Sequence, residues 1–165
     1  MVNFILQSVG DWTEGTSCTP TALAAIFGCP LDEIKRRLQE VAAQDGQNIP
    51  LDRRDYAGKH WRAVVRNLGA QCTVIEDYTQ EPHDQLLTIN RWIERNTHPA
   101  TVLVYCDDKH VAPTEQDATG HLFAAQGPWV VDTRTSGKLQ QRPKIPSHWP
   151  DYRVKRVYEV TVPTY

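Results

Sequence analysis

Residues 16–28 read TSCTPTALAAIFG, and this stretch decides how the first half of the chain folds. From Pro20 to Phe27 the apolar residues recur at helical spacing. Ser and Thr residues stand before them as possible N-caps, and Gly28 suits the position just past the end of a helix. The stretch therefore predicts a short buried helix over 20–27, with Cys18 within about one turn of its start.

Patterning on both sides of this helix predicts an α+β fold. Apolar stripes at helical spacing predict three more helices, and runs rich in β-branched or aromatic residues predict five strands. The further helices are expected at 31–41, 61–68 and 86–93, and the strands at 72–75, 101–105, 122–125, 129–132 and 154–162. Since helices come first and most strands later, we expect an antiparallel sheet in one domain spanning 1–165, with the Cys18 helix packed on it.

The composition favours one globular domain and no strongly charged partner. The chain has 165 residues, of which 40% are hydrophobic and 23% charged, with a formal net charge of −2 and a pI of about 6.3. Nucleic acids and anionic membranes usually bind a concentrated basic face, so neither is expected as a partner. The first twelve residues contain no basic residue before their short apolar run, which is typical of neither a signal peptide nor a membrane span. A cytoplasmic location is the expectation.

Only one of the four cysteines stands in an activating context. Cys18, Cys29, Cys72 and Cys106 form no C-x-x-C pair, so free thiols are expected. The unpaired amides and the dipole at a helix N-terminus favour negative charge, and the thiolate is the reactive form of cysteine. Cys18 is therefore the candidate nucleophile, whereas the other three read as small packed residues.

A second informative stretch, GHLFAAQGPWVVDT at 120–133, predicts two strands joined by a turn at Gly127-Pro128. In such a hairpin Asp132 returns close to His121. A carboxylate beside an imidazole fixes its tautomer and stabilises its charged form, as a catalytic base requires. Together with Cys18, these residues make a nucleophile, a base and an orienting acid.

These motifs resemble the papain-like cysteine hydrolase superfamily, especially its small bacterial and phage-type members and the bacteriocin-leader peptidase-like proteins. The segments SCTPTAL at 17–23, GHLFA at 120–124 and WVVD at 129–132 carry the resemblance, and PATVLV at 99–104 resembles the strand before the family's histidine. The resemblance implies a Cys18-His121-Asp132 triad, a protein or peptide substrate and no cofactor.

The resemblance also implies a glutamine in the oxyanion hole, which the superfamily often places a few residues before its cysteine. The nearest upstream glutamine here is Gln7, eleven positions before Cys18. A bulging loop over 8–17 would return Gln7 to the thiol, with the Cys18 amide as a second donor. Gln7 is therefore the candidate oxyanion-hole residue.

Several alternatives stay open from the sequence. The same resemblance covers transglutaminase-like and deamidase members, in which the acyl acceptor or the amide that is cleaved differs. A non-enzymatic binding protein could use the same scaffold, because a fold does not fix a function. A metal is not expected, because Cys106, Asp107, Asp108 and His110 lie too close together along the chain to suit a tetrahedral site.

Overall fold

An antiparallel sheet organises the computed structural model of the chain, which describes residues 2–46, 58–114, 120–145 and 151–163. The strand order is β1-β7-β3-β4-β5-β6, and β2 also pairs with β7. The strands are β1 (Val2–Asn3), β2 (Gln71–Asp77), β3 (Thr101–Asp107), β4 (His121–Gln126), β5 (Trp129–Val131), β6 (Gln140–Gln141) and β7 (Arg153–Val162). The helices are α1 (Cys18–Phe27), α2 (Leu31–Gln44), α3 (Gly58–Asn67) and α4 (Ile89–Arg95), with short 3-10 turns η1 (His83–Gln85) and η2 (Thr133–Thr135). The predicted α+β class and antiparallel sheet are confirmed.

Helix α1 forms where the apolar stretch predicted it. Ser17 precedes it in an extended conformation, and Pro20 is tolerated because the amides of the first helical turn have no partner within the helix. Gly28 ends it with a φ of 65°, a left-handed conformation that glycine adopts without strain. Nearly every residue of α1 is buried, so the helix runs inside the molecule and packs on β4.

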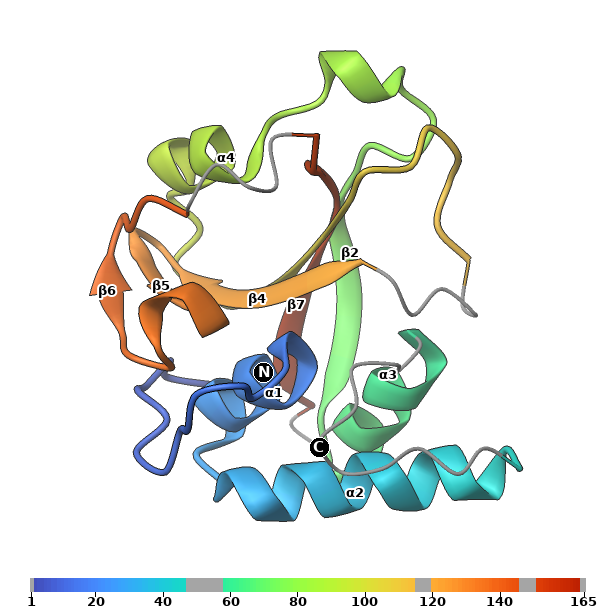
Figure 1. Cartoon of the computed structure of the whole chain (residues 1–165), viewed down its shortest axis with the longest axis vertical. Coiled ribbons are helices and arrows are strands. Elements are labelled where there is room, and N and C mark those ends of the chain that lie inside the picture. The colour runs from blue at the N-terminus through green and yellow to red at the C-terminus, as the bar shows by residue number, and fades with distance from the viewer. Residues whose placement is uncertain (1, 47–57, 115–119, 146–150, 164–165) are drawn as a thin grey trace.

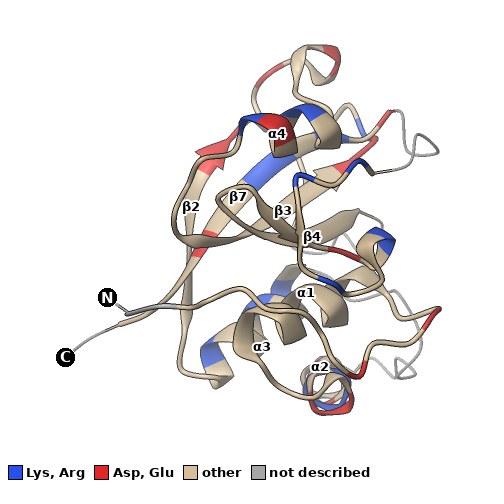
Figure 2. Ribbon diagram, turned by 90° about the vertical axis from the view of Figure 1, so that its left-hand side faces the viewer, with Lys and Arg blue, Asp and Glu red and all other residues tan. Residues whose placement is uncertain are grey.

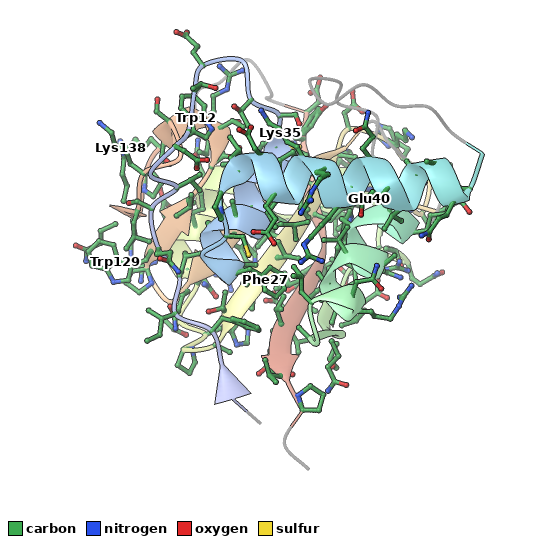
Figure 3. All side chains as sticks on the ribbon, turned by 90° about the horizontal axis from the view of Figure 1, so that it is seen from below. Trp12, Phe27, Lys35, Glu40, Trp129 and Lys138 are labelled. Atoms are coloured by element: carbon green, nitrogen blue, oxygen red, sulfur yellow. The ribbon has the colours of Figure 1, made fainter. Side chains whose placement is uncertain are left out.

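The other helices bury one face each. Helix α2 lies outside α1 and buries Ile34 and Leu38, while Lys35 and Glu40 lie along it in the view from below (Figure 3). Helix α3 buries Trp61 and Val64. Each apolar stripe predicted from the sequence faces the core.

The start of α4 was predicted too early. The expected helix covered 86–93, but α4 begins at Ile89, because the Thr88 side chain accepts a hydrogen bond from the Arg91 amide and caps it there. Leu86 instead ends the η1 turn. The apolar spacing continued through both elements and hid the break between them.

The sheet separates two apolar clusters. Leu103 and Leu122 pack with α1, α2 and α3 on one face, whereas Val104 and Phe123 pack with α4 on the other. Figure 1 shows α1, α2 and α3 on the same side of the strands and α4 at the opposite end. Because successive side chains along β3 and β4 point to opposite faces of the sheet, each strand contributes residues to both clusters.

The hairpin of β4 and β5 is asymmetric. The turn falls at Gly127-Pro128 as predicted, and Ala124 pairs with Val131 at the last position of β5. The predicted strand 129–132 was one residue too long, because Asp132 leaves it to begin η2. The first residues of β4 thus have no β5 partner, and the start of α1 packs beside this part of the sheet.

Within the described residues, no helix is both long and apolar enough to cross a lipid bilayer.

Candidate active site

His121 and Asp132 meet at the open end of the hairpin. Because Ala124 pairs with Val131, Asp132 lies diagonally across from His121, two positions along on the same face. Their Nε2 and Oδ1 atoms are 2.8 Å apart, and the side chains are 4% and 0% exposed. The distance is that of an ion pair, although the ring N–H is not aligned for a regular hydrogen bond. Register and strand length together therefore create this contact.

The second carboxylate oxygen of Asp132 has a structural role. Oδ2 accepts a hydrogen bond of 3.4 Å from the Arg134 amide, which caps η2. In return the Thr135 hydroxyl accepts a hydrogen bond of 3.1 Å from the Asp132 amide. The cap restricts the Asp132 side chain and so holds Oδ1 toward His121.

Cys18 completes the group from the first residue of α1. Its half-buried thiol lies beside the His121 ring and the Leu122 backbone amide. Burial alone would raise the pKa of the Cys18 thiol, but the close contact with His121 and the positive charge of its ring outweigh burial and lower that pKa. Since His121 Nε2 faces Asp132, its Nδ1 is the nitrogen left for the thiol.

The proton that Cys18 gives up is stabilised on His121. Burial would lower the pKa of the imidazole, but the charge of Asp132, together with the close contacts of the ring with Asp132 and Cys18, raises that pKa to about 10. The direction of both shifts favours a thiolate–imidazolium pair at neutral pH. Such a pair is a prepared nucleophile next to a proton donor.

The pKa of each of the other three cysteines is raised and not lowered. Burial raises the pKa of Cys29, raises that of Cys72 to about 12, and raises that of Cys106 strongly. Cys106 lies beside His121 in the β3–β4 register but is completely buried. Of the four thiols, Cys18 alone has a lowered pKa.

Gln7 does not reach the site, and its prediction as an oxyanion-hole residue is wrong. The backbone amide of Gln7 donates a hydrogen bond to the backbone carbonyl of Ala25. The Gln7 side chain lies against Gly28, at the C-terminal end of α1. Cys18 is at the other end of this ten-residue helix, roughly 15 Å away. The loop over 8–17 packs along the helix instead, with Trp12 donating to Thr21 Oγ1 at 3.1 Å.

Two features of the site had no signal in the sequence pattern. The Leu122 amide reaches Cys18 only because β5 stops short of it. Tyr152, just before β7, lies near the thiol as well: burial raises the pKa of its phenol, and the charges of Asp108 and Cys18 raise it further. Both depend on strand register, which no local spacing in the sequence reveals.

The candidate metal ligands Cys106, Asp107, Asp108 and His110, at the end of β3 and just after it, do not gather as metal ligands. Cys106 and Asp107 belong to β3, Asp107 Oδ1 lies 3.7 Å from Lys155 Nζ, and the His110 ring packs 4.6 Å from that of His83. In the part of the chain that the structure describes, no three His, Cys, Asp or Glu side chains are grouped so as to hold a metal ion.

Comparison of the chain with family models, curated proteins and solved structures yields no match. The site must therefore be interpreted from its own geometry.

Proposed function

We propose that the protein is a thiol-dependent hydrolase of peptide or other amide bonds, with a papain-like arrangement of Cys18, His121 and Asp132. The observation that carries the proposal is the continuous contact from the thiol through the imidazole to a buried carboxylate. A packed cysteine would not need a charged partner, and a surface ion pair would not be enclosed in this way.

The chemistry follows from the three groups. The Cys18 thiolate attacks the substrate carbonyl carbon, and His121 donates its proton to the departing amine, leaving an acyl thioester. Water, deprotonated by the now neutral His121, attacks the thioester, and the released sulfur returns to the thiolate–imidazolium pair. Asp132 stabilises the imidazolium at both stages. The Cys18 amide, which has no partner within the helix because Cys18 is the first residue of α1, is the candidate donor to the oxyanion in place of Gln7.

The same first half-reaction would serve a transglutaminase-like or deamidase enzyme. Such an enzyme would pass the acyl group to an amine, or release ammonia from a side-chain amide. Hydrolysis, whether of a peptide bond or of a side-chain amide, needs no binding site for a second substrate, whereas transfer of the acyl group to an amine does.

Selective alkylation tests the proposal at its first step. At pH 7, a short exposure to iodoacetamide should modify Cys18 about tenfold or more faster than any other cysteine, because only its pKa is lowered. Peptide mapping by mass spectrometry measures the four rates. Cys29 is the internal control, because it is also half-buried at an end of α1 but its pKa is raised.

Equal labelling of Cys18 and Cys29 would remove the case for an activated thiol. The protein would then be better described as a binding module that uses the same scaffold.

A further inference from the structure

A buried hydroxyl joins the first turn of α1 to the loop that precedes it. Thr21 is completely buried, and its hydroxyl donates a hydrogen bond of 2.8 Å to the backbone carbonyl of Ser17. The same oxygen accepts a hydrogen bond of 3.1 Å from the indole N–H of Trp12. A hydroxyl that accepts one bond and donates another has a fixed orientation, and each bond strengthens the other. Trp12, Thr21 and Ser17 thus form a continuous hydrogen-bonded relay that ends at the residue before Cys18.

The carbonyl at the end of this relay belongs to the same peptide group as the Cys18 amide. This peptide bond is trans, so its C=O and N–H point in opposite directions. The Ser17 carbonyl points along α1, where it also accepts from the Thr21 amide at 3.4 Å. The Cys18 N–H therefore points out of the start of the helix, where the proposed mechanism needs a donor to the oxyanion. A hydrogen bond to the carbonyl also polarises the peptide group and makes its N–H a stronger donor.

The Trp12 ring is anchored by the turn that follows Asp132. A Cβ atom on Gly137 would lie 2.6 Å from Trp12 Cγ, so the ring rests directly on the backbone of Gly137. The Gly137 amide donates to the Asp132 carbonyl at 3.0 Å, and its carbonyl accepts from the Val9 amide at 2.8 Å. Figure 3 shows Trp12 on the loop before α1. The relay is thus connected to the turn that holds the acid of the site.

The first turn of α1 has no other side chain that could orient this peptide group. No residue of α1 is charged, and the helix lies between the sheet and α2 (Figure 2). Among the described residues, the Ser17 side chain accepts no hydrogen bond from the amides of the first turn, although Ser17 occupies the N-cap position. The hydroxyl of Thr21 is therefore the side-chain group that fixes the carbonyl.

From this geometry we infer that Trp12 and Thr21 are positioning residues, which orient the Cys18 amide toward the oxyanion that forms when a substrate carbonyl is attacked. The inference rests on the proposed hydrolase function and names the residues that support its oxyanion donor. Neither side chain touches the reacting atoms, since both act through the Ser17 carbonyl.

Two small reagents distinguish orientation of the donor from activation of the thiol. With p-nitrophenyl acetate, the Cys18 sulfur attacks the carbonyl carbon, negative charge develops on the carbonyl oxygen, and p-nitrophenolate leaves an acetyl thioester. With iodoacetamide, the same sulfur forms a bond to carbon as iodide leaves, and no oxyanion forms. We would measure both rates at pH 7 and subtract those of Cys18→Ala. The ratio of acylation to alkylation then reports the oxyanion donor.

Substitutions in the relay should lower this ratio. Thr21→Val removes the hydroxyl at nearly constant volume, so acylation should slow about tenfold, part of the loss that follows removal of a whole oxyanion donor, while alkylation stays within about twofold. Thr21→Ser keeps the hydroxyl and should restore the ratio. Trp12→Phe keeps a ring on Gly137 but loses the indole donor, and it should lower the ratio about threefold. This variant tests the relay even if Thr21→Val does not fold.

Trp92→Phe is the matched control for the loss of an indole donor. Trp92 is buried in the cluster on the other face of the sheet, and its indole N–H lies 3.4 Å from Glu76 Oε1. The substitution removes the same kind of hydrogen bond at a distance from Cys18. It should leave the ratio of the two rates unchanged, whatever it costs in stability.

The outcomes separate the two proposals. An unchanged ratio in Thr21→Val and Trp12→Phe, an equal fall in both rates, or a ratio in Thr21→Ser as low as in Thr21→Val would overturn the positioning role while the activated thiol stands. If iodoacetamide labels Cys18 no faster than Cys29 in the unmodified protein, the hydrolase proposal fails and the positioning role with it.

Discussion

The charge on His121 results from opposing effects that act on a single enclosed side chain. Burial disfavours the imidazolium, but Asp132 and Cys18 favour it and prevail, so its pKa rises to about 10. In return His121 lowers the pKa of the Cys18 thiol. Each group therefore holds the other in its charged form, and neither state is expected alone.

Replacing His121 should change how Cys18 reactivity depends on pH. With His121 present, the pKa of the Cys18 thiol lies below its ordinary value, so labelling should decline only as the pH falls through this lowered pKa. In His121→Ala burial and the charge of Asp132 raise the pKa of the Cys18 thiol, and the Leu122 amide is the opposing group that remains. Labelling at pH 7 should then fall about tenfold or more and increase steeply toward alkaline pH.

The matched control for this experiment is His60→Ala. His60 is also buried beside an aspartate, with Nε2 3.3 Å from Asp45 Oδ2, but it lies on α3. Its substitution should leave the labelling profile of Cys18 unchanged. A flat profile in His121→Ala would mean that the imidazole does not activate the thiol.

Protonation of His121 also links stability to pH. Its folded pKa is above the ordinary value of 6.5, so its contribution to stability is complete below about 6.5 and is lost as the pH rises toward about 10. Hydrolysis should decline over the same alkaline range, because the leaving amine then lacks its proton donor.

Residue type and local context were enough to predict Cys18, His121 and Asp132 as one group, which the structure brings together. A helix start and a two-residue hairpin turn are local features that the sequence specifies strongly. Gln7 was predicted by analogy with a spacing that this chain does not have. Its position depends on how the loop over 8–17 packs along α1, which no local pattern specifies.

At the scale of elements, the early end of β5 shapes the site. The strand stops at Val131, and the capped η2 turn begins at once. Sequence patterning continued the strand through Asp132, because three apolar residues before an aspartate look the same whether the chain stays extended or turns. The very short strands β1 and β6 were missed for a related reason: two-residue pairings leave no periodic signal.

Asp132 should therefore behave as both an orienting acid and a cap. Asp132→Ala removes both functions and should lower the unfolding free energy by about 1 kcal/mol as well as the labelling rate of Cys18. Asp132→Asn offers one acceptor oxygen where the carboxylate uses two. It should therefore preserve either the stability or the labelling rate of Cys18 better than Asp132→Ala does, but not both. Melting temperature and the labelling rate, measured on both variants, test this.

Thr135→Val is a control for the turn alone, because it removes a hydroxyl that bonds to the Asp132 amide without touching His121. It should lower stability and leave the labelling rate near that of the unmodified protein. An unchanged labelling rate in Asp132→Ala would take Asp132 out of the site and leave it as a cap.

At the scale of the whole molecule, stability and reactivity come from different places. The two clusters on either face of the sheet contain the fully buried side chains, including Leu103, Val104 and Phe123. The site lies at the rim, where the start of α1 meets the open end of the hairpin. Binary patterning predicts such cores well, because each strand contributes alternate residues to both faces. It does not predict which strands become neighbours, such as β7, β3 and β4 in the middle of the sheet.

This separation predicts that the nucleophile is dispensable for folding. Cys18→Ala removes a half-buried sulfur whose charged form is costly to bury, so the unfolding free energy should change by no more than about 0.5 kcal/mol or rise slightly. Cys106→Ala makes the same chemical change in the core, where the sulfur is completely buried, and should cost about 1 kcal/mol. Hydrolysis of a peptide substrate should disappear in Cys18→Ala and persist in Cys106→Ala. If Cys18→Ala loses as much stability as Cys106→Ala, Cys18 is a packing residue. If Cys18→Ala folds and still cleaves the peptide, the thiol mechanism is wrong, because the only atom removed is the one that must attack the carbonyl.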